Sequence, residues 1–406
     1  MEKMLNIQDQ YKFPMGQVML ETEPTAEVTF AMTNRKALTG MPISKYVQPE
    51  ELQEYYDGLR EVRFTPEEIA ILERQTDKRY TKEFLGYLAS FRLPAIEVSI
   101  DSWNKDITAE TTAPWNAASL WEIPMLSAIP ELYYPRLIEA QGGSMAEVWN
   151  EGDRRLTDMI KLMKAHPYVK FAEFGTRRRF SSAWQDHAVE RFVNECPENL
   201  IGTSNPWLAA KYDIPAVGTN AHELAMVYAA LKESRGGNPL DGQNQVITDW
   251  LERFPSMPVA LIDTFTSDIT LHDLTDSQIE HLRSFRIDSG NEYKIGHKVI
   301  SFLEHHGVDA RTRTLFFSNS LSPEKTIELA DEFKDKIGVS FGIGGNAVNN
   351  MGLPGMNIVA KAVNVNGHGT VKLSDDEGKH MGHPDAVKRY QKLAEDRLAK
   401  NASLVT

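Results

Sequence analysis

Three adjacent arginines, Arg177, Arg178 and Arg179, follow the hydrophobic run VKFAEF in a chain whose formal net charge is −13. Neighbouring guanidiniums repel one another, so the arrangement is favoured where an anion balances their charge. Arginine binds phosphate and carboxylate through two parallel hydrogen bonds. Successive side chains on a loop point in different directions, so a single site would not hold all three. The triplet predicts a site for a small polyanion; the alternative is a solvated helix start with surface salt bridges.

A second candidate is the segment VGTNAHE, which contains Thr219, His222 and Glu223. The turn at Gly218 and Thr219 would leave a hydroxyl available to a ligand, and His222 would begin the next helix with Glu223 beside it. A histidine in that place can act as a nucleophile or as a general acid or base. The alternative interpretation is a histidine that caps or packs the helix.

Two further loops have the residue types that bind a phosphorylated sugar. In FRIDSGN, Arg286 suits an anionic group, Asp288 suits hydroxyls, and Ser289 and Gly290 form a small-residue turn. In FGIGGN, the bare N–H groups of Gly344 and Gly345 can approach phosphate closely. A glycine loop alone is weak evidence, and this one gains weight from its position.

The elements that must position these residues are short β-branched and aromatic runs alternating with amphipathic stretches between about residue 170 and residue 348. This rhythm predicts βα units around a parallel sheet, and each candidate residue follows a strand, where α/β proteins build their sites. About seven units favour an irregular, incomplete α/β barrel over an open doubly wound sheet. We therefore predict a barrel at 141–356 beside an N-terminal α+β domain at 1–140, completed by a hairpin and helix returning from 357–406.

Composition narrows the class of protein. The chain has 406 residues, and Cys196 is its one cysteine, which excludes intrachain disulfides and cysteine metal cages. No apolar run reaches the ~18 residues that span a bilayer, and the N-terminal residues do not resemble a secretory signal. We expect a cytoplasmic protein. Its acidity argues against nucleic-acid and membrane partners.

The remaining histidines suggest no metal site. His368, His380 and His383 lie in a turn-rich stretch whose spacing matches no short helical ligand motif. We predict surface histidines there and no metal held by the protein's own residues.

Read together, the motifs resemble those of nicotinate phosphoribosyltransferases. The resemblance rests on the ordered series DQYKFPMGQVM, LWEIPML, EFGTRRRFS, GTSN, GTNAHE, RIDSGN, FGIG, NIVAKAVNVNG and KLSDDEGK, which spans nearly the whole chain. It implies transfer of a phosphoribosyl group from 5-phosphoribosyl 1-pyrophosphate to nicotinate, coupled to ATP hydrolysis, as an entry step to NAD. It also implies Mg²⁺ accompanying ATP and pyrophosphate, and a possible homodimer.

The resemblance also assigns roles. His222 matches a histidine that becomes phosphorylated, and Tyr11, Thr219 and Arg286 match positions that contact nicotinate. Asp288 would stabilise an oxocarbenium-like ribose or fix its hydroxyls, and Glu223, next to the phosphorylated residue, is expected to take part in catalysis. The residues expected to bind 5-phosphoribosyl 1-pyrophosphate are Arg177, Arg178, Arg179, Ser289, Gly290, Gly344 and Gly345.

Three positions depart from the family pattern: Asn291 and Asn319 stand where the family usually has aspartate, and Gly345 where it usually has threonine. These changes leave a transferase with a weaker hold on its phosphorylated substrate as the leading hypothesis. The alternatives are a transferase that uses nicotinamide or another pyridine, and a catalytically impaired nucleotide-binding relative. Another sugar-phosphate barrel enzyme would need a lysine or paired carboxylates at the strand ends.

Overall fold

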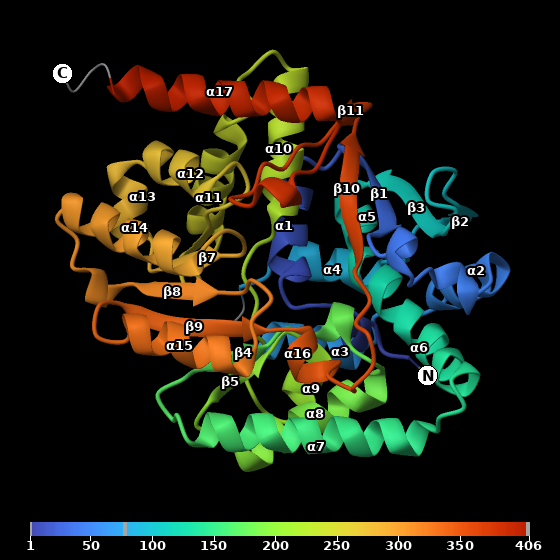
Figure 1. The fold of residues 1–406 in the computed structure, drawn as a ribbon. Coiled ribbons are helices and arrows are strands. Elements are labelled where there is room, and N and C mark those ends of the chain that lie inside the picture. The colour runs from blue at the N-terminus through green and yellow to red at the C-terminus, as the bar shows by residue number, and fades with distance from the viewer. Residues whose placement is uncertain (1, 76–78, 403–406) are drawn as a thin grey trace. The chain divides into compact units, whose positions relative to one another are not determined.

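The computed structural model describes residues 2–75 and 79–402 (Figure 1). The chain divides into two compact units. Unit 1 comprises Met1–Gly218, Ser320–Glu324 and Gly342–Lys361; unit 2 comprises Thr219–Asn319, Lys325–Phe341 and Ala362–Thr406. Strands β9 (Gly338–Ile343) and β10 (Ile358–Val365) contribute residues to both units. The division predicted from the sequence stays a prediction.

Unit 1 contains antiparallel strands. β1 (Glu27–Asn34) pairs with β3 (Ile107–Pro114), and β3 pairs with the edge strand β2 (Glu97–Ile100). Alternate residues of β1 and β3 are buried, as expected of strands with one face against a core. The N–H of Arg35, after β1, donates to the carbonyl of Asn357, just before β10, at 2.9 Å. β2 and β3 thus form an antiparallel hairpin connected by residues 101–106, and the segment before β10 is hydrogen-bonded to the segment after β1.

Unit 1 also holds two parallel strands, β4 (Phe171–Glu173) and β5 (Leu200–Thr203). The end of β9 adjoins β4, where the N–H of Phe174 donates to the carbonyl of Ile343 at 2.8 Å. The helices of unit 1 are α1 (Lys12–Thr22), α2 (Pro49–Leu59), α3 (Pro66–Gln75), α4 (Lys82–Ser90), α5 (Trp115–Ser119), α6 (Glu122–Ala140), α7 (Met145–Lys164), α8 (Ser182–Glu195), α9 (Pro206–Lys211) and α16 (Gly345–Val348).

Unit 2 is built on the parallel strands β6 (Val259–Leu261), β7 (Ser284–Ile287) and β8 (Thr314–Phe317), followed by the first residues of β9. Because β9 continues into unit 1, the strand order is β5-β4-β9-β8-β7-β6. The predicted mixed α/β fold with a parallel and an antiparallel sheet is thus confirmed. In the part of the chain that is described, the sheet has edge strands and is not seen to close into a barrel. The sequence rhythm predicts a strand before His222, but the described residues 216–219 form only one bridge, from Ala216 to Thr203.

Helices follow the strands of unit 2, as the alternating pattern predicts. They are α10 (His222–Ser234), α11 (Asp241–Arg253), α12 (Ser267–Asp273), α13 (Asp276–His281), α14 (Glu292–His305), most of α15 (Pro323–Phe333) and α17 (Pro384–Ala402). The predicted C-terminal hairpin is confirmed, because β10 pairs antiparallel with β11 (His368–Gly369) across Asn366 and Gly367.

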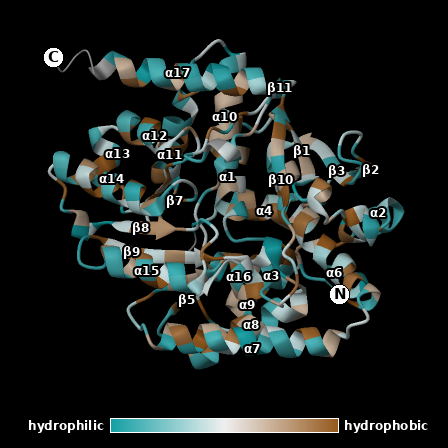
Figure 2. Cartoon of the chain, in the orientation of Figure 1, coloured by the Kyte–Doolittle hydropathy of each residue, from teal (hydrophilic) through white to brown (hydrophobic). Residues whose placement is uncertain are grey.

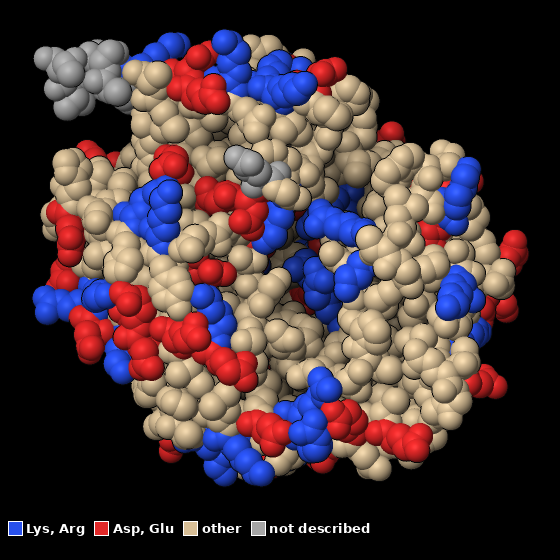
Figure 3. All heavy atoms as spheres, viewed as in Figure 1, with Lys and Arg blue, Asp and Glu red and all other residues tan. Residues whose placement is uncertain are grey.

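Polar and apolar faces show why the longer helices lie where they do. α7 alternates hydrophilic and hydrophobic residues, and Leu156, Met159, Ile160 and Met163 form its buried face (Figure 2). Basic and acidic side chains intermix over the exposed sides of α7 and α17 (Figure 3). The charged tail helix predicted from the sequence is therefore confirmed as α17, which packs on α12 through Arg397 and Asp273, 2.6 Å apart.

Cys196 is buried at the end of α8, and burial raises the pKa of its thiol to about 12. None of the described helices is long and apolar enough to cross a membrane.

Candidate active site

His222 is the first residue of α10 and lies at the centre of a buried polar cluster in unit 2. Its Nδ1 lies 3.0 Å from the hydroxyl of Thr264. On the other side of the ring, Nε2 lies 3.2 Å from Asp288 Oδ2 and 3.0 Å from Lys372 Nζ. Burial, reinforced by the Lys372 ammonium, lowers the pKa of His222 to about 4. The imidazole is therefore neutral near pH 7, as a nucleophile must be.

Arg286, on β7, joins two residues that were predicted from separate segments. Its guanidinium donates to the hydroxyl of Thr219 at 2.7 Å and to the carbonyl of Asn220 at 2.9 Å. It also lies 3.6 Å from the carboxylate of Asp288. Burial alone would raise the pKa of Asp288, but Arg286 and its other polar neighbours hold that pKa well below its ordinary value. The structure thus brings Thr219, His222, Arg286 and Asp288 together.

Ser289 and Gly290 complete the loop after β7. The Ser289 hydroxyl donates to Asp263 Oδ2 and accepts a hydrogen bond from the N–H of Asp375 at 3.1 Å. Gly290 has φ +78°, and a Cβ there would lie 2.6 Å from Ile295 Cδ1. Glycine is therefore required both by the backbone and by the close packing of its neighbours.

Glu223 is buried in the first turn of α10, where its carboxylate suits the positive end of the helix. The helix position thus explains on structural grounds why a glutamate stands here, apart from the catalytic role expected of it.

In unit 1 the arginine triplet separates into three environments. The guanidinium of Arg177 lies 3.3 Å from Glu122 Oε1. Arg178 uses its carbonyl to accept a hydrogen bond from Asn349 Nδ2 at 2.8 Å. Arg179 is buried, and its guanidinium donates to the carbonyl of Asn6 at 2.8 Å. The side chains of Arg177 and Arg179 therefore contact different partners, in line with the expectation that one site does not hold the whole triplet.

The glycine loop lies beside the triplet. A Cβ built on Gly175 would lie 2.0 Å from Val348 Cγ2 and 3.2 Å from the carbonyl oxygen of Gly344, so only glycine fits there. A Cβ on Gly345 would meet its nearest neighbour, Arg178 Cβ, at 4.0 Å. The structure thus brings together two predicted phosphate-binding segments more than 160 residues apart in the sequence.

Glu173 anchors the start of this loop. Its carboxylate, buried at the end of β4, accepts hydrogen bonds from Gly175 N at 2.5 Å, Thr203 Oγ1 at 2.5 Å and Gln185 Nε2 at 3.1 Å. Burial raises the pKa of Glu173 to about 7 despite these donors, and the nearby Asp9 carboxylate adds to the rise.

Sequence reasoning missed Glu122, to which the predicted nicotinate residue Tyr11 donates from its hydroxyl at 3.0 Å. The buried ammonium of Lys12 lies 2.6 Å from Glu122, and Lys361 lies 4.0 Å from it. Burial alone would raise the pKa of Glu122, but Lys12, Lys361 and Arg177 together lower it. An acidic residue inside the apolar segment LWEIPML was the signal that could have revealed it.

Lys372 and Asp263 were also missed. Asp263 is fully buried, 3.8 Å from His222 Nε2 and 3.7 Å from Lys372 Nζ. It follows β6 as Asp288 follows β7, so the rule of strand ends could have found it. No local pattern marks Lys372.

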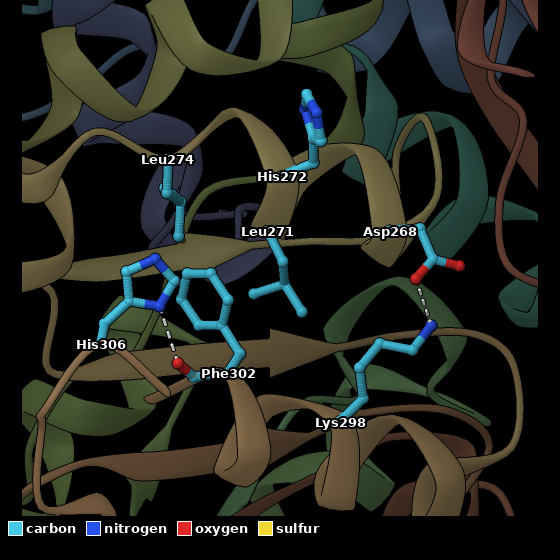
Figure 4. A pocket seen from close by; sticks show the side chains of 7 residues that line it. All are labelled: Asp268, Leu271, His272, Leu274, Lys298, Phe302 and His306. Atoms are coloured by element: carbon cyan, nitrogen blue, oxygen red, sulfur yellow. Dashed lines mark hydrogen bonds and ion pairs between the residues drawn. The ribbon is translucent and has the colours of Figure 1, made fainter. Parts of the chain in front are cut away.

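A separate hollow of about 340 Å³ lies between α12 and α14 of unit 2 (Figure 4). Leu271 and Phe302 line its apolar wall, and Lys298 forms an ion pair with Asp268 at 2.7 Å on its rim (Figure 4). None of the predicted site residues lines it.

A mixed α/β protein with charged and hydroxyl residues gathered after its parallel strands is typical of enzymes that act on small anions. The fold matches solved nicotinate phosphoribosyltransferases. That from Porphyromonas gingivalis has a TM-score of 0.88 at 26% identity over 97% of this chain and 100% of its own. A structure described as a putative nicotinate phosphoribosyltransferase from Saccharomyces cerevisiae has a TM-score of 0.84 at 26% identity over 97% and 98%.

Sequence comparisons identify the family. The nicotinate phosphoribosyltransferase family model matches residues 169–397, and the model of the N-terminal domain of these proteins matches residues 7–130. Nicotinate phosphoribosyltransferases from Acinetobacter baumannii and Neisseria meningitidis are each 33% identical to this chain over 94% of both chains. The chain belongs to the nicotinate phosphoribosyltransferase family.

Proposed function

We propose that this chain transfers the phosphoribosyl group of 5-phosphoribosyl 1-pyrophosphate to nicotinate, giving nicotinate mononucleotide and pyrophosphate for NAD synthesis. The observation that carries the proposal is the convergence of Arg286, Thr219, His222 and Asp288 in one buried cluster. Family membership indicates which substrates this cluster binds, and the charges of its residues suit those substrates.

Nicotinate is a flat ring with one carboxylate, and a guanidinium is the group that binds a carboxylate most specifically. Arg286 is held in place by Thr219 and Ser318, so its binding fork is ordered before a ligand arrives. We assign the nicotinate carboxylate to Arg286 and Thr219, and the aromatic face of Tyr11 to the pyridine ring.

Asp288 supplies the negative charge that the reaction needs. As the bond between C1 and the pyrophosphate oxygen breaks, the ribose gains positive character, which an ionised carboxylate stabilises. The low pKa of Asp288 keeps it ionised throughout the neutral range. In unit 1, Arg177 and Arg178 with the N–H groups of Gly344 and Gly345 are assigned to the phosphates of the substrate.

Arg179, Ser289 and Gly290 were also predicted to bind 5-phosphoribosyl 1-pyrophosphate. Their buried contacts support an indirect part, in which they fix the loops that present the other groups.

ATP is coupled to the reaction by phosphorylation of His222. The Nε2 lone pair attacks the γ-phosphorus, the P–N bond forms, the bond to the bridging β,γ-oxygen breaks, and ADP leaves. Water later cleaves the P–N bond to give phosphate. The neutral ring and the position of His222 at the N-terminus of α10 both favour an anionic phosphoryl group there.

Mg²⁺ is assigned to the substrates. Within the described residues, no three histidine, cysteine, aspartate or glutamate side chains are arranged to hold a metal. The ammonium of Lys372 beside Asp263 also opposes a divalent cage there. The residues present therefore fit an ion that arrives with ATP or pyrophosphate and neutralises phosphate charge.

The finer expectations from the sequence belong to this proposal as well. We assign the six parallel strands to an irregular, incomplete barrel, the protein to the cytoplasm, and its assembly to a homodimer. The family resemblance supports each of the three.

The decisive experiment measures pyrophosphate release from 5-phosphoribosyl 1-pyrophosphate with nicotinate or nicotinamide, each with and without ATP. We expect release with nicotinate, faster when ATP is present. Release with nicotinamide alone would establish the other pyridine as substrate. Binding of nicotinate mononucleotide without any release would establish an impaired relative instead.

The matched variant is His222→Ala, for which we expect acceleration by ATP to be lost while slow transfer remains. If ATP accelerates this variant as it does the parent, His222 is not the phosphorylated residue.

A further inference from the structure

Nε2 of His222 faces two groups that place opposite demands on it. Asp288 Oδ2, at 3.2 Å, is ionised and can only accept a hydrogen bond, so it requires a proton on Nε2. Lys372 Nζ, at 3.0 Å, can only donate while it is charged, so it requires a lone pair on Nε2. A neutral imidazole satisfies one partner at a time. Which partner prevails decides whether Nε2 is a nucleophile.

The second ring nitrogen does not decide between these states. Nδ1 lies 3.0 Å from the Thr264 hydroxyl, which can accept from Nδ1–H or donate to a bare Nδ1. Thr264 therefore orients the ring and permits both tautomers. The choice rests with the charged groups at Nε2.

The backbone around Lys372 is firmly held. Its N–H and carbonyl exchange hydrogen bonds with Met381 at 3.0 and 2.9 Å. The next two N–H groups, of Leu373 and Ser374, both donate to the carbonyl of Thr264, the residue whose hydroxyl contacts His222. One residue thus locates both the imidazole and the segment that carries the lysine. Lys372 is also buried, so its ammonium is poorly screened by water.

The charges that face His222 come from three segments. Asp263 follows β6 and lies 3.8 Å from Nε2, Asp288 follows β7, and Lys372 precedes the turn to Met381. The guanidinium of Arg286 lies 3.6 Å from the other carboxylate oxygen of Asp288, Oδ1. Both carboxylates favour a protonated ring, whereas Lys372 and the positive end of α10 oppose it. Lys372 carries the ammonium that contacts the ring, at 3.0 Å from Nε2.

We infer that Lys372 is a positioning residue that holds His222 as the tautomer with a proton on Nδ1 and a lone pair on Nε2, and then lies against the phosphoryl group as its counter-cation. The inference rests on the proposed phosphorylation of His222. Before the transfer, the ammonium donates to the lone pair. During the transfer, the lone pair forms the P–N bond, ADP leaves with the electrons of the broken P–O bond, and the ammonium turns to a phosphoryl oxygen. The Nδ1 proton remains beside Thr264.

The first test needs no variant. NMR of the full chain with ¹⁵N-labelled histidine, with His222 assigned by comparison with His222→Asn, reports which ring nitrogen carries the proton. At pH 7 we expect Nδ1–H and a bare Nε2. A proton on Nε2 would overturn the inference even if the enzyme is phosphorylated by ATP normally.

The second test follows acid-labile labelling of the protein by [γ-³²P]ATP across pH 5 to 8 in the parent, Lys372→Met, Lys372→Arg and the control Lys298→Met. Lys298 belongs to the same unit and forms an ion pair with Asp268. Both residues line the α12–α14 hollow, which contains none of the residues that contact His222. In Lys372→Met the pKa of His222 should rise from about 4, because the ammonium that opposes a charged ring is lost while Asp263 and Asp288 remain, and burial still holds the pKa below its ordinary value.

We therefore expect the acid limb of the labelling rate of Lys372→Met to shift to higher pH than in the parent, with the largest loss of rate at pH 5. Lys372→Arg should recover most of this loss, and Lys298→Met should match the parent. Labelling of Lys372→Met at the parental rate with the same acid limb would overturn the inference. Absence of label in the parent would overturn the phosphorylation itself, which separates the two failures.

Discussion

The guanidinium of Arg286 lies 2.7 Å from the hydroxyl of Thr219, although 67 positions separate the two residues in the chain. The hydrogen bond fixes one edge of the arginine fork and leaves the side chain ordered before substrate binds. The same guanidinium lies 3.6 Å from Asp288, so it also connects the proposed pyridine-binding and ribose-binding residues.

Replacing Arg286 by methionine should raise the KM for nicotinate about thirtyfold, because a hydrogen bond to a charged group is worth about 2 kcal/mol. Arg286→Lys keeps the charge without the fork and should recover only part of the affinity. The control is Arg283→Met just before the same strand, where the guanidinium donates to the carbonyl of Glu280. An unchanged KM for nicotinate in Arg286→Met would remove Arg286 from the binding site.

Glu122→Gln should destabilise unit 1 by about 3–5 kcal/mol, because it removes the buried carboxylate that balances the ammonium of Lys12. The double variant Lys12→Met with Glu122→Gln should regain much of this loss. Urea unfolding of the single and double variants measures both effects. Equal losses in the single and double variants would mean that the ion pair is not the source of the stability.

Stability should depend on pH through Glu173. Its folded pKa of about 7 lies above its unfolded value of about 4.5, so the folded state binds the proton more tightly. The free energy of unfolding should therefore fall as the pH rises from about 4.5 to 7, by up to about 3 kcal/mol. Glu173→Gln should flatten this slope in urea unfolding at pH 5 and pH 8. An unaltered slope would assign the titration to another group.

Titration of Asp375 should also make the free energy of unfolding fall as the pH rises, but over a lower pH range, since burial raises its pKa to about 6. A residual slope below pH 6 in Glu173→Gln is therefore expected. Adding Asp375→Asn should remove it.

Gly345→Thr should lower the KM for 5-phosphoribosyl 1-pyrophosphate by roughly ten- to a hundredfold, because a hydroxyl bonded to a charged acceptor contributes roughly 1.5–3 kcal/mol. The nearest neighbour of a Cβ at this position is 4.0 Å away, so the threonine has room. Gly344→Thr is the contrast, because its Cβ would lie 3.1 Å from the carbonyl oxygen of Phe174. Equal effects at both positions would contradict a hydroxyl-specific gain.

The other two departures from the family pattern have structural explanations. Asn291 caps α14 by accepting from the N–H of Lys294 at 2.9 Å, a role that aspartate would fill equally well. Asn319 donates to Glu292 at 3.1 Å and accepts from Lys379 at 2.8 Å. An ionised aspartate could not donate to Glu292, so the amide is required by its neighbours.

Residues that follow strands could be predicted from the sequence, because the carboxyl ends of parallel strands share one edge of a sheet. That rule placed His222, Arg286 and Asp288 near one another, and they do lie close together, although Asp288 is the one of the three that directly follows a strand and Arg286 lies within β7. A hairpin within residues 357–406 was predicted as well, and β10 and β11 form it with a turn at Asn366 and Gly367. The strand predicted before His222 was wrong, because residues 216–219 form one bridge to Thr203 and then turn into α10.

Lys372 and Glu122 could not be found in this way. Lys372 reaches His222 across 150 positions, and its own segment carries no periodicity that marks a site. Glu122 lies at the start of a buried helix, where its partners come from α1, the loop after β4 and β10. Pairings of this kind depend on tertiary packing, which a single sequence does not encode locally.

The lone buried thiol has a practical consequence. Because the pKa of Cys196 lies near 12, almost none of it is thiolate at neutral pH, and thiol reagents attack the thiolate. A cysteine introduced at an exposed position such as Trp103 would then be the preferred target of a fluorophore or spin label. The native protein thus provides a chemically silent background on which substrate-dependent movements can be followed without first removing its own cysteine.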